Sequence, residues 1–280
     1  MRVIHTDTII QAVSEMCIEA NIHLGADMES ALKHARDREI SENGIEILET
    51  MQKNLIVAAE KKIPICQDTG MVVIFLTIGQ QVQIEGGSLS DALQKGVEKG
   101  YQEGFLRKSV VSDPLLRSNT GTNTPAIIHF NIAEGQTFKI KLLPKGFGSE
   151  NTSALKMLKP AEGLAGVKKF ILDTIENGSP NACAPVVVGV GIGGTMEKAA
   201  LMAKEALSRP LGSHHPADHI QSLEEYLLEA ANQLGIGPMG LGGVNTVLGI
   251  NIETFPTHIA GLPVAVNMGC YVNRHVEREL

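Results

Sequence analysis

The 280-residue sequence has no tryptophan and few other aromatic residues, which together make up only 4% of the chain. Surfaces that stack single-stranded nucleic acid depend on aromatic rings. Basic residues are not in excess either, because the formal net charge is -7. Proteins that bind nucleic acid or anionic membranes are usually basic. We therefore expect no nucleic acid and no membrane among its partners.

Long apolar runs are also missing, since none approaches the roughly 18 residues of a membrane span. The N-terminal segment MRVIHTDTIIQAVSEM lacks the apolar stretch of a signal peptide and carries Asp7 and Glu15, so we expect a cytoplasmic protein. Four cysteines are too few for a disulfide scaffold. In a reducing compartment they are buried thiols, nucleophiles or metal ligands.

The remaining composition is that of an ordinary globular protein, with 43% hydrophobic and 20% charged residues. Apolar residues recur at helical spacing from Ile9 to Ala20, and the segments 28–38 and 45–60 have the same period. Pro64 follows them. We predict one domain over residues 1–280 with a helical N-terminal part over about 1–62.

Beyond residue 62 the pattern alternates between strands and helices. The apolar run 71–78 predicts a buried strand, 82–87 a hairpin continuation of it, and 126–132 with 137–143 a second hairpin. Further expected elements are helices over 88–103, 161–175, 197–207 and 222–234, a polar loop over 112–124, and strands over 184–193, 246–252 and 262–267. This mixture predicts an α+β (mixed α/β) fold.

A glycine-rich turn at residues 189–194 (GVGIGG) matches the GxGxxG pattern of dinucleotide-binding folds. That fold also needs a second strand ending in an acidic residue about 20 residues later. The sequence there reads SRPLGSHHPADH and predicts no strand. We favour a tight strand-to-helix turn with close packing, and keep a nucleotide-binding dehydrogenase as an alternative.

Three histidines, His214, His215 and His219, lie close together in the sequence. With a nearby carboxylate they could ligate zinc. No further ligand group has regular spacing to them, so we interpret them as part of an exposed loop.

The cysteines fall into two kinds. Cys17 lies on the apolar face of the first predicted helix and is expected in the core. Cys66 (PICQDTG), Cys183 (NACAP) and Cys270 (NMGCY) each stand at the end or start of a strand-like run, beside turn-forming residues. Cysteines in such places are better suited to bind a metal. Their spacing differs from the compact cysteine runs of ferredoxins.

Several segments together identify a family. They are PICQDTG at 64–70, KGFGSEN at 145–151, residues 188–211, GIGPMGLGG at 235–243, and residues 257–270, which end in GC. At these segments the sequence resembles the N-terminal catalytic half of the class I iron-sulfur-dependent fumarate hydratases, in the form where that half is a separate α subunit. The tartrate dehydratase α subunit belongs to the same family. The resemblance covers nearly the whole chain and implies the iron-sulfur hydro-lyase α-type fold.

The resemblance implies that Cys66, Cys183 and Cys270 hold one [4Fe–4S] cluster. Four thiolates would occupy the outer position of every iron, as in an electron carrier. Three leave one iron open to act as a Lewis acid toward a substrate carboxylate and hydroxyl. The cluster would then serve hydration rather than electron transfer.

The resemblance also places Gln67 and Asp68 at the substrate. Asp68 would handle a proton or orient water. A local Asx-turn with Thr69 and Gly70 is an equally good explanation of the same aspartate, and does not exclude this role. Arg107, in FLRKSV, matches an arginine that clamps a substrate carboxylate, a task for which a fork of donors is suited.

Gly146 and Gly148 match a loop whose backbone N–H groups bind a carboxylate, although Phe147 stands where many relatives have glycine. His258, in FPTHIAGLP, matches an active-site histidine, and we expect it beside the third cysteine. The alternative for His258 is a hydrogen-bonded loop residue without a catalytic role.

The loop that begins at Gly148 looks more like the fumarase form, which favours reversible hydration of fumarate to malate, with tartrate dehydration as the alternative. The sequence stops at Leu280, soon after the third cysteine. We therefore expect a β subunit that carries the rest of the active site, in an α2β2 assembly that acts on a small dicarboxylate. A non-catalytic scaffold subunit with the same fold is the remaining possibility.

Overall fold

The computed structural model describes residues 1–280 and divides into two compact units. The first unit comprises Met1–Gly25, Leu55–Phe147 and Arg274–Leu280, and the second comprises Ala26–Asn54 and Gly148–Asn273. One boundary falls within helix α3 (Glu42–Lys61). A single catalytic domain over the whole chain stays a prediction.

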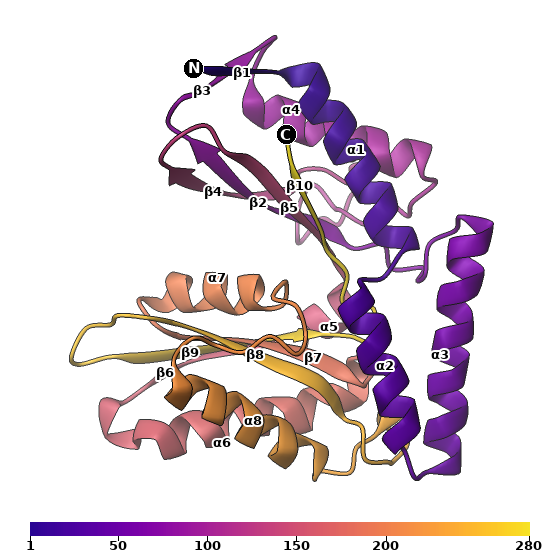
Figure 1. Ribbon diagram of the computed structural model, residues 1–280, viewed down its shortest axis with the longest axis vertical. Coiled ribbons are helices and arrows are strands. Elements are labelled where there is room, and N and C mark those ends of the chain that lie inside the picture. Colours follow the sequence, from indigo (N-terminus) through magenta and orange to yellow (C-terminus); the bar gives the residue numbers. More distant parts are fainter. The chain divides into compact units, whose positions relative to one another are not determined.

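The first unit is built on a four-stranded sheet in the order β10-β5-β2-β4, with α1 and α4 on one face (Figure 1). β2 pairs antiparallel with β5 and parallel with β4. Its alternate residues, Val72, Ile74 and Leu76, are buried against the two helices. The elements are β1 (Arg2–His5), α1 (Thr6–Ile22), β2 (Met71–Gly79), β3 (Val82–Glu85), α4 (Leu89–Glu103), β4 (Ile127–Ala133), β5 (Phe138–Lys145) and β10 (Val276–Glu279).

The second unit has a four-stranded sheet in the order β6-β9-β7-β8. Figure 1 shows α7 on one face of this sheet and α6 and α8 on the other. Strand β7 is central and almost wholly buried, which explains its continuous run of valine and glycine. The elements are α2 (Ala26–Arg38), α5 (Phe147–Glu150), β6 (Ala154–Leu158), α6 (Gly163–Gly178), β7 (Val186–Gly193), α7 (Met196–Ala206), α8 (Asp218–Asn232), β8 (Val247–Phe255) and β9 (Leu262–Gly269).

The first two glycines of the GxGxxG motif are packing residues. A Cβ atom on Gly189 would lie 2.1 Å from the carbonyl oxygen of Ala203, and one on Gly191 would lie 2.1 Å from that of Ala199. Both carbonyls belong to α7, so glycine is what allows this helix to lie directly on β7. The interpretation of the motif as close strand-helix packing is confirmed.

The α+β fold class is confirmed, and most elements lie within a few residues of their predicted bounds. Ser88 caps the N-terminus of α4, because its side chain accepts a hydrogen bond from the N–H of Asp91 at 3.3 Å. The N-cap of α1 is His5, whose side chain accepts a hydrogen bond from the N–H of Asp7 in the first turn.

Both predicted hairpins are wrong. β4 and β5 do not pair with each other, because β2 lies between them. β3 pairs in parallel with β1 at the N-terminus rather than with β2. A short turn between two apolar runs shows only that the runs are close in the sequence. In the first sheet, β2 comes from an earlier part of the chain and separates β4 from β5.

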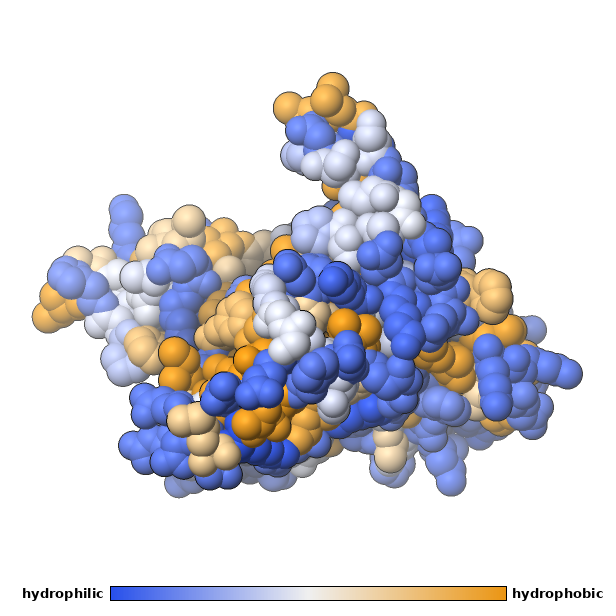
Figure 2. Space-filling model, turned by 90° about the horizontal axis from the view of Figure 1, so that it is seen from above, coloured by the Kyte–Doolittle hydropathy of each residue, from blue (hydrophilic) through white to orange (hydrophobic).

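No helix has the length and the apolar character needed to cross a membrane. On the face drawn in Figure 2, hydrophilic residues separate the hydrophobic ones into patches. Exposed apolar side chains such as Phe130 and Ile132 on the edge strand β4 belong to the first unit.

Candidate active site

The segment from Cys66 to Gly70 forms a fixed turn that leads into β2. The N–H of Ile65 donates to the Asn21 carbonyl at 2.9 Å, which ties the segment to the end of α1. Gly70 has a φ of 79°, and a Cβ there would lie 2.6 Å from the Pro144 carbonyl carbon, so only glycine is accommodated. Within this turn Cys66 is half-buried and Gln67 is exposed.

The carboxylate of Asp68 is held by two backbone N–H groups. Gly70 donates to Oδ1 at 3.0 Å, and Phe147 donates to Oδ2 at 2.8 Å. The first contact is the expected Asx-turn. The second comes from the KGFGSEN segment and places Gly146 beside the same carboxylate, since a Cβ on Gly146 would lie 3.2 Å from Oδ2. Two segments that are distant in the sequence therefore meet at Asp68.

Arg107 follows α4 and its side chain is exposed. The Thr69 hydroxyl donates to the Arg107 carbonyl at 2.7 Å, so the arginine backbone lies against the same turn. The first unit thus brings together five of the predicted site residues: Cys66, Gln67, Asp68, Arg107 and Gly146.

Three buried side chains that support this turn were missed by sequence reasoning. The Tyr101 hydroxyl donates to the Thr69 carbonyl at 2.5 Å, and the Asn123 amide donates to the Gly70 carbonyl at 3.1 Å. Arg274 is only 5% exposed and donates to the Asp68 carbonyl through Nη2. Its Nε and Nη1 atoms have no hydrogen-bond partner in the structure. No local pattern in the sequence distinguishes these residues from ordinary core and surface positions.

Cys183 and Cys270 are neighbours in the second unit. The N–H of Tyr271 donates to the Cys183 carbonyl at 3.3 Å. Cys183 precedes β7 and Cys270 follows β9, and the antiparallel register of these strands opposes Val187 to Gly269. Cys183 is exposed and has a φ of 54°, a left-handed conformation that is uncommon for residues other than glycine.

Gly148 lies near the same end of the second sheet. It is part of α5, whose Glu150 accepts a hydrogen bond from the Asn267 amide at 3.0 Å, three residues before Cys270. Glu150 also forms an ion pair with Lys204 of α7. Burial lowers the pKa of Lys204, while the charge of Glu150 and the hydrogen bond to it oppose that shift.

His258 does not lie beside Cys270, so the expected adjacency is wrong. It follows β8, whose last residue, Phe255, pairs with Gly193 at the far end of β7. The eight residues of β7 span about 23 Å between that end and the cysteines. The exposed imidazole accepts a hydrogen bond from the Ala260 N–H at 3.2 Å through Nδ1. This contact fits the alternative of a hydrogen-bonded loop residue.

The other cysteine and the histidine group behave as expected. Cys17 is fully buried in the core of the first unit, and burial raises the pKa of its thiol. His214 and His219 are exposed, and His215 accepts the N–H of Ala217 at 3.0 Å. Neither unit forms by itself a group of three His, Cys, Asp or Glu side chains that could hold a metal ion.

The donor set near the two cysteine regions fits an anionic iron-sulfur group. Iron-sulfur clusters are held by thiolates, and Cys66, Cys183 and Cys270 all lie at least partly on the surface, unlike Cys17. In the first unit the buried cation Arg274, with its unpartnered donor atoms, is bonded to the residue two positions after Cys66. A buried charge of this kind is stabilised by an anion.

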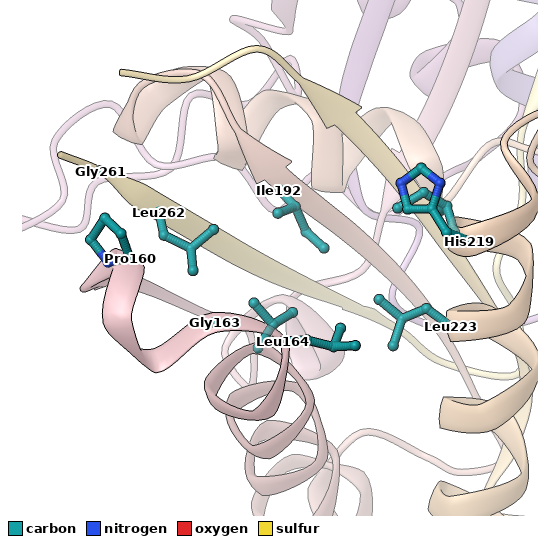
Figure 3. A pocket seen from close by; sticks show the side chains of 10 residues that line it. Pro160, Gly163, Leu164, Ile192, His219, Leu223, Gly261 and Leu262 are labelled. Atoms are coloured by element: carbon teal, nitrogen blue, oxygen red, sulfur yellow. The ribbon is translucent and has the colours of Figure 1, made fainter. Parts of the chain in front are cut away.

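A separate apolar pocket of about 430 Å³ lies between the first turns of α6 and α8 (Figure 3). Figure 3 shows Leu164, Ile192 and Leu223 pointing toward it and His219 at its side. Pro160, Gly163, Val167, Ile220, Gly261 and Leu262 complete its lining. None of the predicted site residues lines this pocket, so it is distinct from the candidate active site.

The sequence of nearly the whole chain matches one enzyme family. A family model described as Fumarate hydratase (Fumerase) matches residues 10–279, and the chain belongs to this family of hydro-lyases. It is 42% identical to the "Putative L(+)-tartrate dehydratase subunit alpha" of Methanocaldococcus jannaschii. The match extends over 278 residues and covers 97% of each chain. It is 36% identical over 251 residues to the L(+)-tartrate dehydratase subunit alpha of Escherichia coli K12, covering 89% of this chain and 82% of the relative. The Shigella sonnei protein of the same name gives the same values.

Proposed function

We propose that this chain is the α subunit of a [4Fe–4S]-dependent hydro-lyase that reversibly hydrates fumarate to malate. The observation that carries the proposal is the convergence of Asp68, Arg107 and Gly146 on the turn after Cys66, in a chain that matches the fumarate hydratase family almost throughout. The proposed cluster ligands are Cys66 in the first unit and Cys183 and Cys270 in the second. A cluster with three protein ligands supplies an open iron as a Lewis acid.

The residues of the turn have distinct tasks in this proposal. The Arg107 guanidinium binds a substrate carboxylate, because its planar fork of donors matches the two carboxylate oxygens. The backbone around Gly146 lies next to Asp68, and we assign it, with Gly148, to the substrate carboxylates. Gln67 is exposed and can donate to or accept from the substrate through its amide.

Asp68 is proposed to orient the reacting water or to accept its proton. Its two oxygens each accept one backbone N–H, which fixes the carboxylate and leaves further lone pairs available. A group whose orientation is already fixed need not reorganise during the reaction. His258 is kept as a proton-transfer candidate on the resemblance alone.

A β subunit is part of the proposal. The relatives named above are called alpha subunits, which supports a partner that contributes further substrate-binding and proton-transfer residues. We propose an α2β2 complex as the active form.

Tartrate dehydration is the second candidate, and the names of the relatives at 42% and 36% identity favour it. The two substrates differ in the hydroxyl groups that the site must bind. A site built to hydrogen-bond a substrate hydroxyl rejects an analogue that lacks it, by a factor of about 10⁴ or more.

The test is a substrate comparison with the complex of this chain and its β subunit, purified without oxygen. We expect kcat/KM for fumarate and malate to exceed that for L(+)-tartrate by at least about 100-fold. The opposite ratio would assign the chain to tartrate dehydration. If an iron-loaded complex dehydrated neither malate nor tartrate, both candidates would be wrong.

A further inference from the structure

A buried glutamate that follows α2 is hydrogen-bonded to the loop over residues 236–246, which precedes β8. Glu39 is 6% exposed. Its carboxylate accepts the N–H groups of Val244 at 3.1 Å and of Asn245 at 3.2 Å, together with the Asn245 side-chain amide at 2.7 Å. It also accepts the N–H groups of Ile40 and Ser41, so its position on the helix end is fixed.

The glutamate and the loop also fit closely in shape. Gly243 has a φ of 134°, and a Cβ on it would lie 2.6 Å from Oε1 of Glu39. The partner amide of Asn245 is fully buried and donates a second hydrogen bond to the Ala35 carbonyl at 2.9 Å. Glu39 and the loop therefore form one rigid contact. Burial raises the pKa of Glu39, but the hydrogen bonds from Asn245 and from the backbone together outweigh burial, so the pKa is lowered.

The same loop is bonded to the backbone on the C-terminal side of Cys183. Met239 donates its N–H to the Ala184 carbonyl at 2.8 Å, and Thr246 accepts the N–H of Val186 through its carbonyl at 2.9 Å. Within the loop, the N–H of Gly237 donates to the Thr246 hydroxyl at 3.1 Å. A continuous series of contacts thus runs from Glu39 to the residues that follow Cys183.

The conformations at the end of this series are unfavourable for isolated residues. Cys183 has a φ of 54° and Met239 a φ of 52°. Residues with side chains adopt this region only when the surrounding structure holds them there, and such residues are common at functional sites. The loop is hydrogen-bonded to Ala184 and Val186, which directly follow Cys183.

We propose that Glu39 is a positioning residue that sets the geometry of Cys183 as a cluster ligand through the 236–246 loop. This rests on the proposed function, because it takes Cys183 to be a ligand. Groups that orient metal ligands typically change metal affinity by 10–100-fold when they are altered.

Two variants alter the contact between Glu39 and the loop, one at the glutamate and one at the loop. Glu39→Gln keeps the shape of the side chain but removes the charge, and Gly243→Ala introduces a methyl group against the carboxylate. Glu224→Gln is the matched control. Glu224 is also 6% exposed in the same unit, but its contacts go to Arg209 and to the N–H of Ile252, away from Cys183.

The first readout is hydrogen-deuterium exchange of the metal-free chain, followed in peptides that cover 180–186 and 236–246. The second is the iron that the reconstituted protein retains against a chelator. We expect both variants to speed exchange in both peptides by about tenfold and to weaken iron retention by about 10–100-fold. Glu224→Gln should change neither. Because exchange is measured on the native fold, unchanged exchange in α7 (Met196–Ala206), which lies in the same unit as the substitutions, shows that this unit is folded in the variants.

Unchanged exchange at 180–186 in both variants would overturn the inference, as would faster exchange there with iron retention like that of the unaltered protein. If the unaltered chain bound no iron or sulfide while the exchange pattern appeared as expected, the cluster proposal would be wrong. The connection from Glu39 through the 236–246 loop to the residues after Cys183 would then be supported on its own.

Discussion

At the scale of single residues, the four cysteines differ in their surroundings. Cys17 is buried in the core among apolar side chains, whereas Cys66, Cys183 and Cys270 adjoin turns at strand ends. We predict that Cys→Ser at any of these three abolishes cluster absorption near ~400 nm, since two thiolates remain. Cys17→Ala should retain it. Loss of the cluster in Cys17→Ala and its retention in one of the three serine variants would show that the ligands are misassigned.

Arg107 is expected to bind the substrate rather than take part in the proton chemistry. Removing one charge-assisted contact costs about 1.5–3 kcal/mol. Arg107→Ala should therefore raise KM about 10-fold or more, and kcat should change much less. Lys108→Ala, at the adjacent exposed position, is the control. Steady-state kinetics on the α–β complex measure both constants. An unchanged KM would mean that Arg107 does not bind the substrate.

His258 has a role that rests on the family resemblance alone, since the structure places it at the other end of β7 from the cysteines. His258→Asn keeps a hydrogen-bonding side chain but cannot titrate near neutral pH. We expect kcat to fall by about 10²-fold with the iron content unchanged. Near-normal kcat would mean that the imidazole serves only its loop, through the hydrogen bond from Ala260.

At the scale of secondary-structure elements, β7 and α7 depend on two glycines for their contact. Gly191→Ala would place a methyl group 2.1 Å from the Ala199 carbonyl oxygen, so the helix must move. We expect a loss of about 1–3 kcal/mol in the free energy of unfolding, measured by denaturant titration. Gly261→Ala, where a Cβ meets nothing closer than 3.7 Å, should be nearly neutral. Equal stability of the two variants would contradict the packing role.

The elements also show what could be predicted from the sequence. Helical spacing located α1 to α3 and α7 closely, because an amphipathic period is a local property. The sheet pairings were not local: β2 separates β4 from β5, and β1 pairs with β3. Likewise, motifs identified Cys66 and Asp68, whereas Arg274 and Asn123 reach the turn only through the tertiary fold.

His258 shows that two residues close in the sequence can lie far apart in the fold. It is twelve positions before Cys270 in the sequence, and that closeness suggested adjacency in space. The strand β9 lies between them and carries Cys270 to the other end of the sheet. Separation along an extended strand grows by about 3.3 Å per residue, so a short interval in the sequence becomes a long distance.

At the scale of the whole molecule, the chain combines two compact units, each with its own sheet and core. The first presents Cys66 with Gln67, Asp68, Arg107 and Gly146, and the second presents Cys183 and Cys270 with Gly148. The chain belongs to the fumarate hydratase family, and its relatives are named alpha subunits. Both findings support the proposal that it is a hydro-lyase subunit. The central claim is that the protein is built around one cluster with three cysteine ligands.

Iron and acid-labile sulfide analysis of the chain, purified and reconstituted without oxygen, tests that claim most directly. The account predicts about four iron and four sulfide per chain, the composition of a single cubane. The Cys66→Ser, Cys183→Ser and Cys270→Ser variants should each fall to near zero in the same preparation. A reconstituted chain without iron and sulfide, or with a full cluster in all three variants, would contradict the account.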